Sequence, residues 1–134
     1  MGEPAENLEV ARRYLQAIER GATGAELRSF FTSDVVLEEF PNRVVPLGKR
    51  RGLAEALEGA QRAKKIMSRQ IYKITRGMAD QGRVALEAEW VGTLAAAFGT
   101  IPAGGQMKAF LAVFLDFRDG KIIKQRNYDC YEAW

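Results

Sequence analysis

Hydrophobic and polar positions follow one period in the first half of the chain and another in the second. In the first half, apolar side chains recur every three to four residues, the spacing of a helix with one buried face. In the second half they recur every second residue, the spacing of a strand with one buried face. This change of period predicts helices first and a sheet of long strands afterwards.

Helices and one short strand are predicted before the change of period. The first helix places Leu8, Leu15 and Ile18 on one face and ends at Gly21. The segment DVVLEEFP predicts a short strand, because it is rich in β-branched residues and ends at a proline. The predicted elements are a helix over residues 5–20, a short helix that begins at Thr23 and carries Phe30 and Phe31 at its end, a strand over residues 34–41 and a helix over residues 53–65.

Long strands are predicted after the change of period. Glycine-containing turns separate them, and Asp119-Gly120 is the strongest hairpin signal in the chain. The predicted strands cover residues 68–78, 83–98, 106–118 and 121–132. Helices followed by an antiparallel meander predict an α+β fold with the helices grouped on one face of a curved sheet. Because the chain has 134 residues and no linker, we expect one domain over residues 1–134.

Composition and charge narrow the range of partners. The net charge is +3 and no nucleic-acid-binding motif is present, so we expect no nucleic-acid partner despite the basic stretch at Lys49, Arg50 and Arg51. The sequence has no apolar run of about 18 residues and no signal-peptide pattern, so we expect a soluble protein without a membrane partner. The single cysteine, Cys130, fits a reducing, cytoplasmic location.

The chain contains no histidine. Histidine is the commonest general base and the commonest metal ligand, so Ser-His-Asp, Cys-His and His-ligated metal chemistry are excluded. Proton transfer would have to rely on Asp, Glu, Tyr, Lys or Cys. The sequence also lacks a spaced acidic cluster, a phosphate loop and a dinucleotide-binding glycine pattern, so we expect neither a metal nor another cofactor.

The last predicted strand carries polar side chains on both of its faces. Because Lys124 and Arg126 are costly to bury, we expect their face to point outward. The opposite face then points inward, and Asp129 becomes the leading candidate for chemistry; a carboxylate paired with a nearby arginine is the alternative. The inward set is Ile123, Gln125, Asn127, Asp129 and Tyr131, and the outward set is Ile122, Lys124, Arg126, Tyr128 and Cys130.

Three segments carry a resemblance to a known superfamily: DVVLEEFPNRVVPLG, EAEWVGTL and the ending FRDGKIIKQRNYDCYEAW. With the order of elements, they make residues 6–134 resemble the nuclear-transport-factor-2-like (NTF2-like) superfamily, and within it the SnoaL-like branch. The resemblance implies a cone-shaped, strongly curved, mostly antiparallel sheet packed against three helices around one apolar pocket. Members include ketosteroid isomerases, limonene-epoxide hydrolases, polyketide cyclases, dehydratases and non-catalytic binding modules.

Most members of the superfamily are dimers through the outer face of the sheet. Here residues 107–117 are apolar on both faces, with Phe110, Ala112 and Phe114 on one of them. A strand that is apolar on both faces needs a partner on each side. We therefore expect a homodimer.

The resemblance also assigns a role to the last strand. In catalytic relatives an acidic residue there acts as general acid or base, and endings of the DYFD type place their first Asp at the position of Asn127. Since that charge is absent here, Asp129 is the residue that could replace it. Tyr14 on the first helix could donate to a developing oxyanion, as in ketosteroid isomerases, or could be a core residue.

Alternation on the first strand directs one of Glu38 and Glu39 inward and the other outward, where it could pair with Arg43. The apolar neighbours of Glu39 favour Glu39 as the inward residue, whereas Phe40 beside Glu38 favours the opposite. Trp90 could form an aromatic wall or belong to the core. The candidate catalytic residues are Asp129, Glu39, Asn127 and Tyr14, and the candidate ligand-binding residues are Trp90, Gln125, Glu38, Phe31 and Tyr131.

Two hypotheses follow. The first is a cofactor-independent enzyme in which a carboxylate transfers a proton on a small apolar molecule, cyclic or polyketide-like, as an isomerase, cyclase, dehydratase or epoxide hydrolase does. The alternative is a ligand-binding or dimerisation module of the same fold without turnover. The absence of histidine and the Asn at position 127 favour this alternative.

Overall fold

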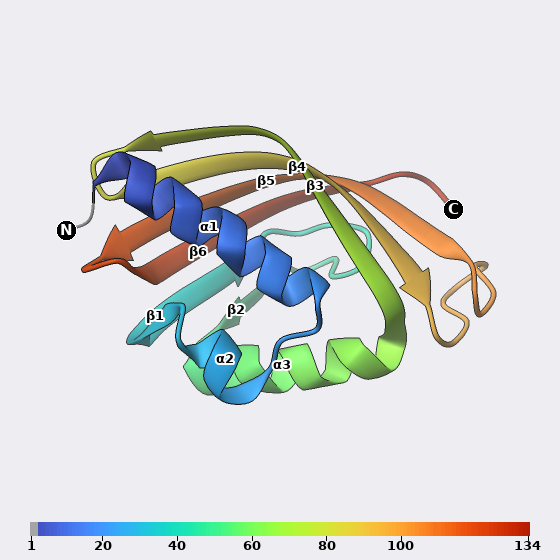
Figure 1. Cartoon of the computed structure of the whole chain (residues 1–134). Coiled ribbons are helices and arrows are strands. Elements are labelled where there is room, and N and C mark those ends of the chain that lie inside the picture. Colours follow the sequence, from blue (N-terminus) through green and yellow to red (C-terminus); the bar gives the residue numbers. More distant parts are fainter. Residues whose placement is uncertain (1–2) are drawn as a thin grey trace.

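A six-stranded sheet curls around one side of three helices in the computed structural model, which describes residues 3–134 (Figure 1). The helices are α1 (Pro4–Glu19), α2 (Gly24–Arg28) and α3 (Leu53–Ile66). The strands are β1 (Phe31–Glu39), β2 (Lys49–Arg51), β3 (Met67–Asp80), β4 (Arg83–Leu94), β5 (Gln106–Arg118) and β6 (Lys121–Tyr131).

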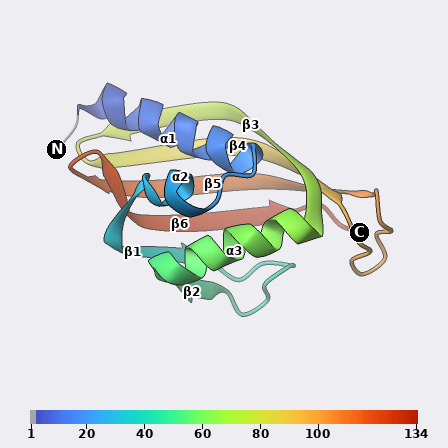
Figure 2. The same ribbon diagram turned by 60° about the horizontal axis from the view of Figure 1, so that its bottom comes forward.

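The strands are arranged in the order β2-β1-β6-β5-β4-β3. Neighbouring strands are antiparallel except β1 and β6, which are parallel. The helices lie on the concave side of the sheet, with α1 packed against β3 and β4 and α3 packed against β1 (Figure 2). This arrangement confirms the predicted α+β fold with helices on one face of a curved sheet.

Alternation in β4 and β5 builds the core. Their inward residues are buried, while many of the residues between them are exposed, as the period of two predicts. Burying a large aliphatic side chain contributes about 1.5–3 kcal/mol to the free energy of folding. The contacts between these buried residues and the apolar face of α1 therefore hold the helix against the concave face of the sheet. The buried residues of the three elements include Ala11, Leu15, Val84, Leu86, Leu94, Leu111, Val113 and Leu115.

The predicted boundary between the second helix and the first strand is wrong. Phe31, predicted at the end of that helix, is the first residue of β1 and pairs with Ile122 of β6. Its ring is buried in the core, so β1 begins three residues before the predicted start at residue 34. Thr23 does precede α2, but its side chain makes no capping hydrogen bond.

The sequence pattern does not predict β2. Its residues are Lys49, Arg50 and Arg51, which provide no alternation of apolar and polar positions. The strand forms because its backbone pairs with the end of β1 and its arginines pair with Glu38 and Glu39.

Two further differences concern the long strands. β4 ends at Leu94 rather than at residue 98, because the amide of Ala95 bonds to the carbonyl of Ile66 and the chain leaves the sheet. In β6 a register shift bypasses Ile123, so Ile122 is the buried residue of the pair. The predicted alternation of β6 holds from Lys124 onward.

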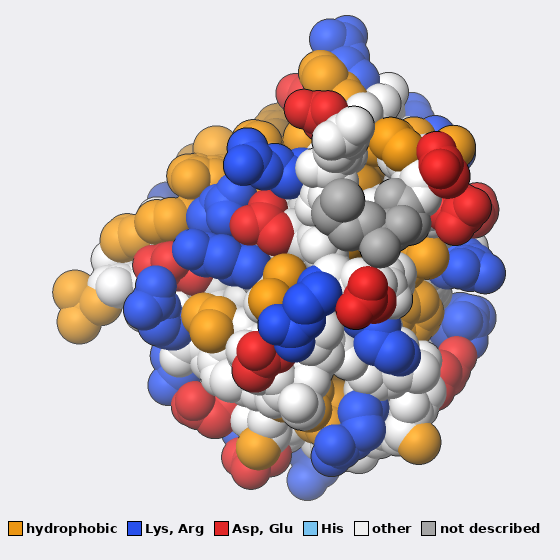
Figure 3. All heavy atoms as spheres, turned by 90° about the vertical axis from the view of Figure 1, so that its left-hand side faces the viewer, with side chains coloured by type: hydrophobic (Ala, Val, Ile, Leu, Met, Phe, Trp, Pro, Cys, Tyr) orange, Lys and Arg blue, Asp and Glu red, His pale blue; other side chains and the backbone are white. Residues whose placement is uncertain are grey.

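Charged side chains cover the end of the molecule that carries the turns between β3 and β4 and between β5 and β6. Lys and Arg alternate there with Asp and Glu, without one large patch of either sign (Figure 3). Among residues 3–134 no helix is long and apolar enough to cross a membrane. The same residues contain no group of three or more His, Cys, Asp or Glu side chains placed to hold a metal ion.

Candidate active site on the concave face of the sheet

Strand β6 contributes Asn127, Asp129 and Tyr131 to the concave face, where each lies opposite a buried residue of β5. In the parallel pair, β1 places Glu39 directly beside Asn127. The structure thereby answers the question of which glutamate points inward. Glu38 lies beside Arg126 on the outer face and pairs with Arg50, so its position does not support the predicted pocket role.

Strands β3 and β4 complete the inner layer. Trp90 lies opposite Ala109 of β5, and Tyr72 lies opposite Trp90. The indole of Trp90 donates a hydrogen bond to Oε1 of Gln70 at 3.0 Å and packs edge-on against Tyr131. Gln70 is not among the predicted site residues, and for Tyr72 the sequence leaves open the same two roles as for Tyr14, a pocket donor or a core residue. The alternation of β3 contains many polar residues and does not single either of them out.

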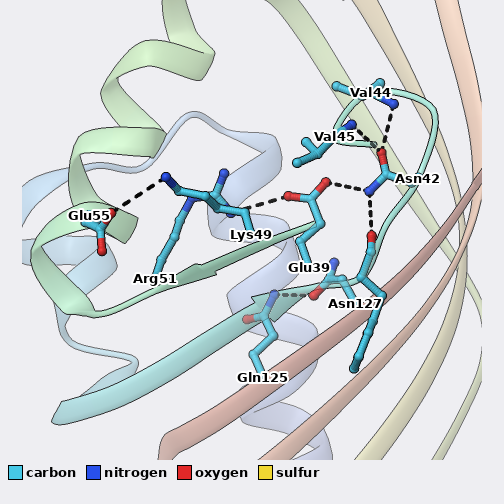
Figure 4. Close-up of polar contacts among 10 residues, drawn as sticks. Glu39, Asn42, Val44, Val45, Lys49, Arg51, Glu55, Gln125 and Asn127 are labelled. Carbon is cyan, nitrogen blue, oxygen red and sulfur yellow. Dashed lines mark hydrogen bonds and ion pairs between the residues drawn. The ribbon is translucent and has the colours of Figure 1, made fainter. Parts of the chain in front are cut away.

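A chain of hydrogen bonds runs from α1 along the inner face of β6. The hydroxyl of Tyr14 donates to Oε1 of Gln125 at 2.6 Å. Nε2 of Gln125 in turn donates to Oδ1 of Asn127 at 2.6 Å (Figure 4). Tyr14 is buried, and its ring packs against Phe30 and Phe31. Phe31 therefore belongs to the core around Tyr14.

Glu39 is held by two partners at the point where β1 ends. Its Oε1 pairs with Arg51 at 3.3 Å, and its Oε2 accepts a hydrogen bond from Nδ2 of Asn42 at 2.9 Å (Figure 4). The Oδ1 of Asn42 in turn accepts from the amides of Val44 and Val45, which fixes the turn after the strand. Glu39 thus presents a fixed negative charge at the edge of the site.

Asp129 has an unusual environment for a carboxylate. Its Oδ1 is buried and has no hydrogen-bond partner, and none of the ion pairs of residues 3–134 includes it. Burial, followed by the negative charge of Glu39, raises the pKa of Asp129 to about 6, while hydrogen bonding from Asn127 opposes this rise. The alternative of an arginine-paired carboxylate at the end of the strand does not hold.

Two tyrosines, Tyr72 and Tyr131, lie within reach of the charge of Asp129, and a third, Tyr14, lies within reach of Tyr72. Burial raises the pKa of Tyr72 and of Tyr131, and the negative charge of Asp129 raises both further. Burial likewise raises the pKa of Tyr14, with a smaller contribution from Tyr72. All three hydroxyls therefore stay protonated near neutral pH and can act as hydrogen-bond donors.

An apolar cavity of about 380 Å³ opens between the C-terminal end of α3, the loop after β4 and the end of β6. Trp90 and Tyr131 line it, so the two aromatic candidates share one wall, whereas Gln125, Asn127 and Asp129 are not among its lining residues. The remaining lining is Val44, Ala63, Lys65, Ile66, Met67, Gln70, Leu94, Ala96, Ala97, Phe98 and Met107. A larger, more polar hollow of about 510 Å³ lies between α1 and β3, and it includes none of the predicted site residues.

The fold agrees with that of known proteins. The model of the SnoaL-like domain matches residues 11–125, and the chain belongs to this family. No curated protein sequence matches the chain.

Several solved structures share the fold. AclR from Streptomyces galilaeus, a proposed hydroxylase, superposes with a TM-score of 0.77 at 19% identity, over 95% of this chain and 76% of that one. A proposed polyketide cyclase from Xanthomonas campestris gives a TM-score of 0.76 at 22% identity, over 96% and 92%. A proposed ketosteroid isomerase from Kribbella flavida gives 0.68 at 20% identity, over 98% and 82%. Identities this low establish a common fold, and the function must come from the site itself.

Proposed function

We propose that the protein is a cofactor-independent enzyme that transfers a proton on a small apolar molecule, with Asp129 as the acid–base group. The observation that carries the proposal is the half-buried carboxyl of Asp129, whose Oδ1 has no hydrogen-bond partner and whose pKa burial and the charge of Glu39 raise to about 6. A group with such a pKa can take a proton and return it near neutral pH.

The chemistry that suits this site begins at a carbon next to a carbonyl group. The carboxylate of Asp129 removes the proton, and the C–H electron pair moves toward the carbonyl oxygen to form an enolate. In a β,γ-unsaturated ketone the neighbouring C=C bond extends this enolate to a dienolate, and returning the proton to the γ-carbon moves the double bond into conjugation and completes an isomerisation. If the enolate carbon attacks a second carbonyl, returning the proton to the new alkoxide completes a cyclisation. A hydroxyl of Tyr72 or Tyr131 donates to the enolate oxygen, where negative charge develops.

An apolar cyclic or polyketide-like substrate is supported by two observations. The cavity beside Tyr131 is lined mainly by aliphatic and aromatic side chains. Structurally similar proteins include a proposed polyketide cyclase and a proposed ketosteroid isomerase.

The test is proton exchange, which detects the first chemical step without knowledge of the product. The protein is incubated in D₂O with fused-ring β-ketoesters and β,γ-unsaturated steroid ketones, and loss of the C–H signal is followed by proton NMR. We expect exchange above the uncatalysed rate, and a loss of about 10²- to 10⁴-fold in Asp129→Asn. The matched control is Asp116→Asn, which removes a carboxylate paired with Arg126 on the outer face. Exchange that is equal in Asp129→Asn and the wild type contradicts the proposal.

A binding module without turnover is the second candidate, and one observation favours it. Asp129 is not among the residues that line the apolar cavity. A molecule could therefore occupy the cavity without touching the carboxyl. Binding of a panel compound, seen as a rise in melting temperature, together with no exchange at any pH, would support this candidate over the enzyme.

We also propose that two copies of the chain associate through the outer face of β5 and β6. Phe110 and Tyr128 are 54% and 43% exposed there, and Tyr128 stacks on Phe40 with ring centroids 4.6 Å apart. Exposed aromatic clusters of this kind mark association surfaces. Light scattering should give twice the chain mass for the wild type and the chain mass for Phe110→Lys; a monomeric wild type would contradict this.

A cytoplasmic location stays a prediction from Cys130.

A further inference from the structure

The hydrogen-bond chain on the inner face has a direction. Asn127 and Asp129 share the inner face of β6, two residues apart, and hydrogen bonding from Asn127 lowers the pKa of Asp129. Because a carboxylate can only accept hydrogen bonds, the amide of Asn127 supplies this bond through its Nδ2 donor. The Oδ1 of Asn127 then faces Gln125 and requires Nε2 of that residue, as observed at 2.6 Å. This leaves Oε1 of Gln125 to accept from the hydroxyl of Tyr14, also at 2.6 Å. The orientation of each side-chain amide therefore determines which group its neighbour in the chain must present.

Burial makes this direction hard to reverse. Tyr14 is 2% exposed and Gln125 is 9% exposed, so little water is available to replace a lost partner. A buried polar group without a partner is costly, which keeps both amides in the orientation that satisfies every link.

We propose that Tyr14, Gln125 and Asn127 form a positioning relay that holds the side-chain amide of Asn127 as a hydrogen-bond donor to Asp129. The relay rests on the proposed function only for its effect on catalysis, since its structural content concerns the free protein. Tyr14 acts through two other residues and lies outside the apolar cavity. Its role thus differs from that of a direct oxyanion donor, which is one of the two alternatives that the sequence leaves open for Tyr14.

Other groups also act on Asp129. Glu39 of β1 raises its pKa, Tyr72 of β3 and Tyr131 of β6 lie within reach of its charge, and Arg51 of β2 holds Glu39. The neighbouring strand β5 places the apolar Leu111 opposite Asp129. The helices contribute apolar residues to the core: Leu15 of α1, Leu27 of α2 and Leu53, Leu57 and Ala60 of α3. The relay therefore supplies the hydrogen bonding that lowers the pKa of Asp129, whereas burial and the charge of Glu39 raise it.

The experiment is a carboxyl NMR titration of the free protein labelled with ¹³C-aspartate. The chain has five aspartates, and the Asp129 signal is the one missing from Asp129→Asn. In Tyr14→Phe, Oε1 of Gln125 loses its donor, so both amides can turn over and the carboxylate loses the Nδ2 donor. We expect the titration midpoint of Asp129 to rise by about one pH unit, because a hydrogen bond to the charged form lowers a pKa.

Two further variants separate a relay from a general structural effect. Gln125→Met breaks the chain in the middle and should raise the midpoint as much as Tyr14→Phe does. The double variant should raise it no further, because a chain broken once transmits nothing. Tyr128→Phe removes a phenol hydroxyl from the outer face and should leave the midpoint unchanged. If Tyr14→Phe does not fold, the titration midpoints of Asp129 in Gln125→Met and Tyr128→Phe are compared instead, and a rise in Gln125→Met alone supports the relay.

An unchanged midpoint in both relay variants overturns the proposal, and so do single shifts that add in the double variant. The outcome is independent of turnover. If the titration midpoints of Asp129 shift as expected while no compound exchanges its C–H protons, the relay is supported and the proposed enzyme is contradicted. If exchange depends on Asp129 while the midpoint is unchanged in the relay variants, the enzyme is supported and the relay is contradicted.

Discussion

The two faces of β6 give their polar side chains opposite kinds of partners. On the outer face, Arg126 pairs with Asp116 at 3.5 Å and lies over the ring of Phe114. Opposite charges pair there, and both side chains are partly exposed to solvent. On the inner face, Asp129 lies beside Glu39, forms no ion pair within residues 3–134, and receives its hydrogen bonding from the neutral amide of Asn127. The outer arrangement stabilises the protein, whereas the inner one costs stability and creates a group ready for proton transfer. Such a local conflict is typical of functional sites.

The largest expected difference between the faces is in packing. Leu115→Ala removes a side chain that is 0% exposed on the inner face of β5. The lost contacts and the resulting cavity should lower the free energy of unfolding by about 2–5 kcal/mol. Phe114→Ala, on the outer face, should cost less than about 1 kcal/mol in the monomer. Denaturant unfolding at two protein concentrations measures both and separates any dimer contribution. Equal losses in the two variants would mean that the faces are not packed as described.

The second difference is the pH dependence of stability. The folded pKa of Asp129 is about 6, above the ordinary 3.8, so the folded state binds this proton more tightly than the unfolded state does. The resulting stability is fully present below the unfolded pKa and is lost as pH rises through the folded one. Asp129→Asn should therefore stabilise the protein at pH 7.5, by at most about 3 kcal/mol, with no gain at pH 3.5.

Asp116→Asn is the matched variant for this comparison. It removes the partner of Arg126 on the outer face and should lower stability at pH 7.5 by less than about 1 kcal/mol. Thermal or denaturant unfolding of both variants across the pH range distinguishes the faces. A loss of stability in Asp129→Asn at pH 7.5 would show that its carboxylate is satisfied in the folded state.

The sequence predicted the parts of this fold that depend on local periodicity. The faces of α1, β4 and β5 follow the spacing of apolar residues, and alternation correctly turned Asp129 inward and Arg126 outward. The carboxylate itself could be found because histidine is absent and few acidic groups occur on inward positions. These features need no knowledge of which segments meet in space.

The rest depends on contacts between distant segments. β2 has no apolar pattern and exists because Arg51 and Glu39 meet across a turn. The sequence could not choose between Glu38 and Glu39, because pairing with β6 decides the face. The link between Tyr14 and Gln125 joins residues 111 positions apart, and its direction follows from the carboxylate at the other end of the chain.

The third prediction concerns the two neighbouring glutamates. Glu39→Gln removes the negative charge that raises the pKa of Asp129, so the titration midpoint of Asp129 should fall, by less than about one pH unit. Any exchange activity should shift its pH profile downward with it. Glu38→Gln changes the adjacent residue on the outer face and should leave the midpoint in place. The same ¹³C titration measures both, and equal shifts would mean that the charge acts from outside the site.

The smallest expected effect comes from the ion pair on the outer face. The side chains of Arg126 and Asp116 are 26% and 32% exposed, so Arg126→Gln should lower the free energy of unfolding by less than about 1 kcal/mol. Salt screens exposed charges, and the loss should shrink when the salt concentration rises from about 0.05 to 0.5 M. Gln125→Met, one residue away on the inner face, breaks hydrogen bonds between neutral groups, and its effect should be the same at both concentrations. A salt-dependent effect of Gln125→Met would place water and ions inside the concave face, and the two sides of the strand would then differ less than their contacts imply.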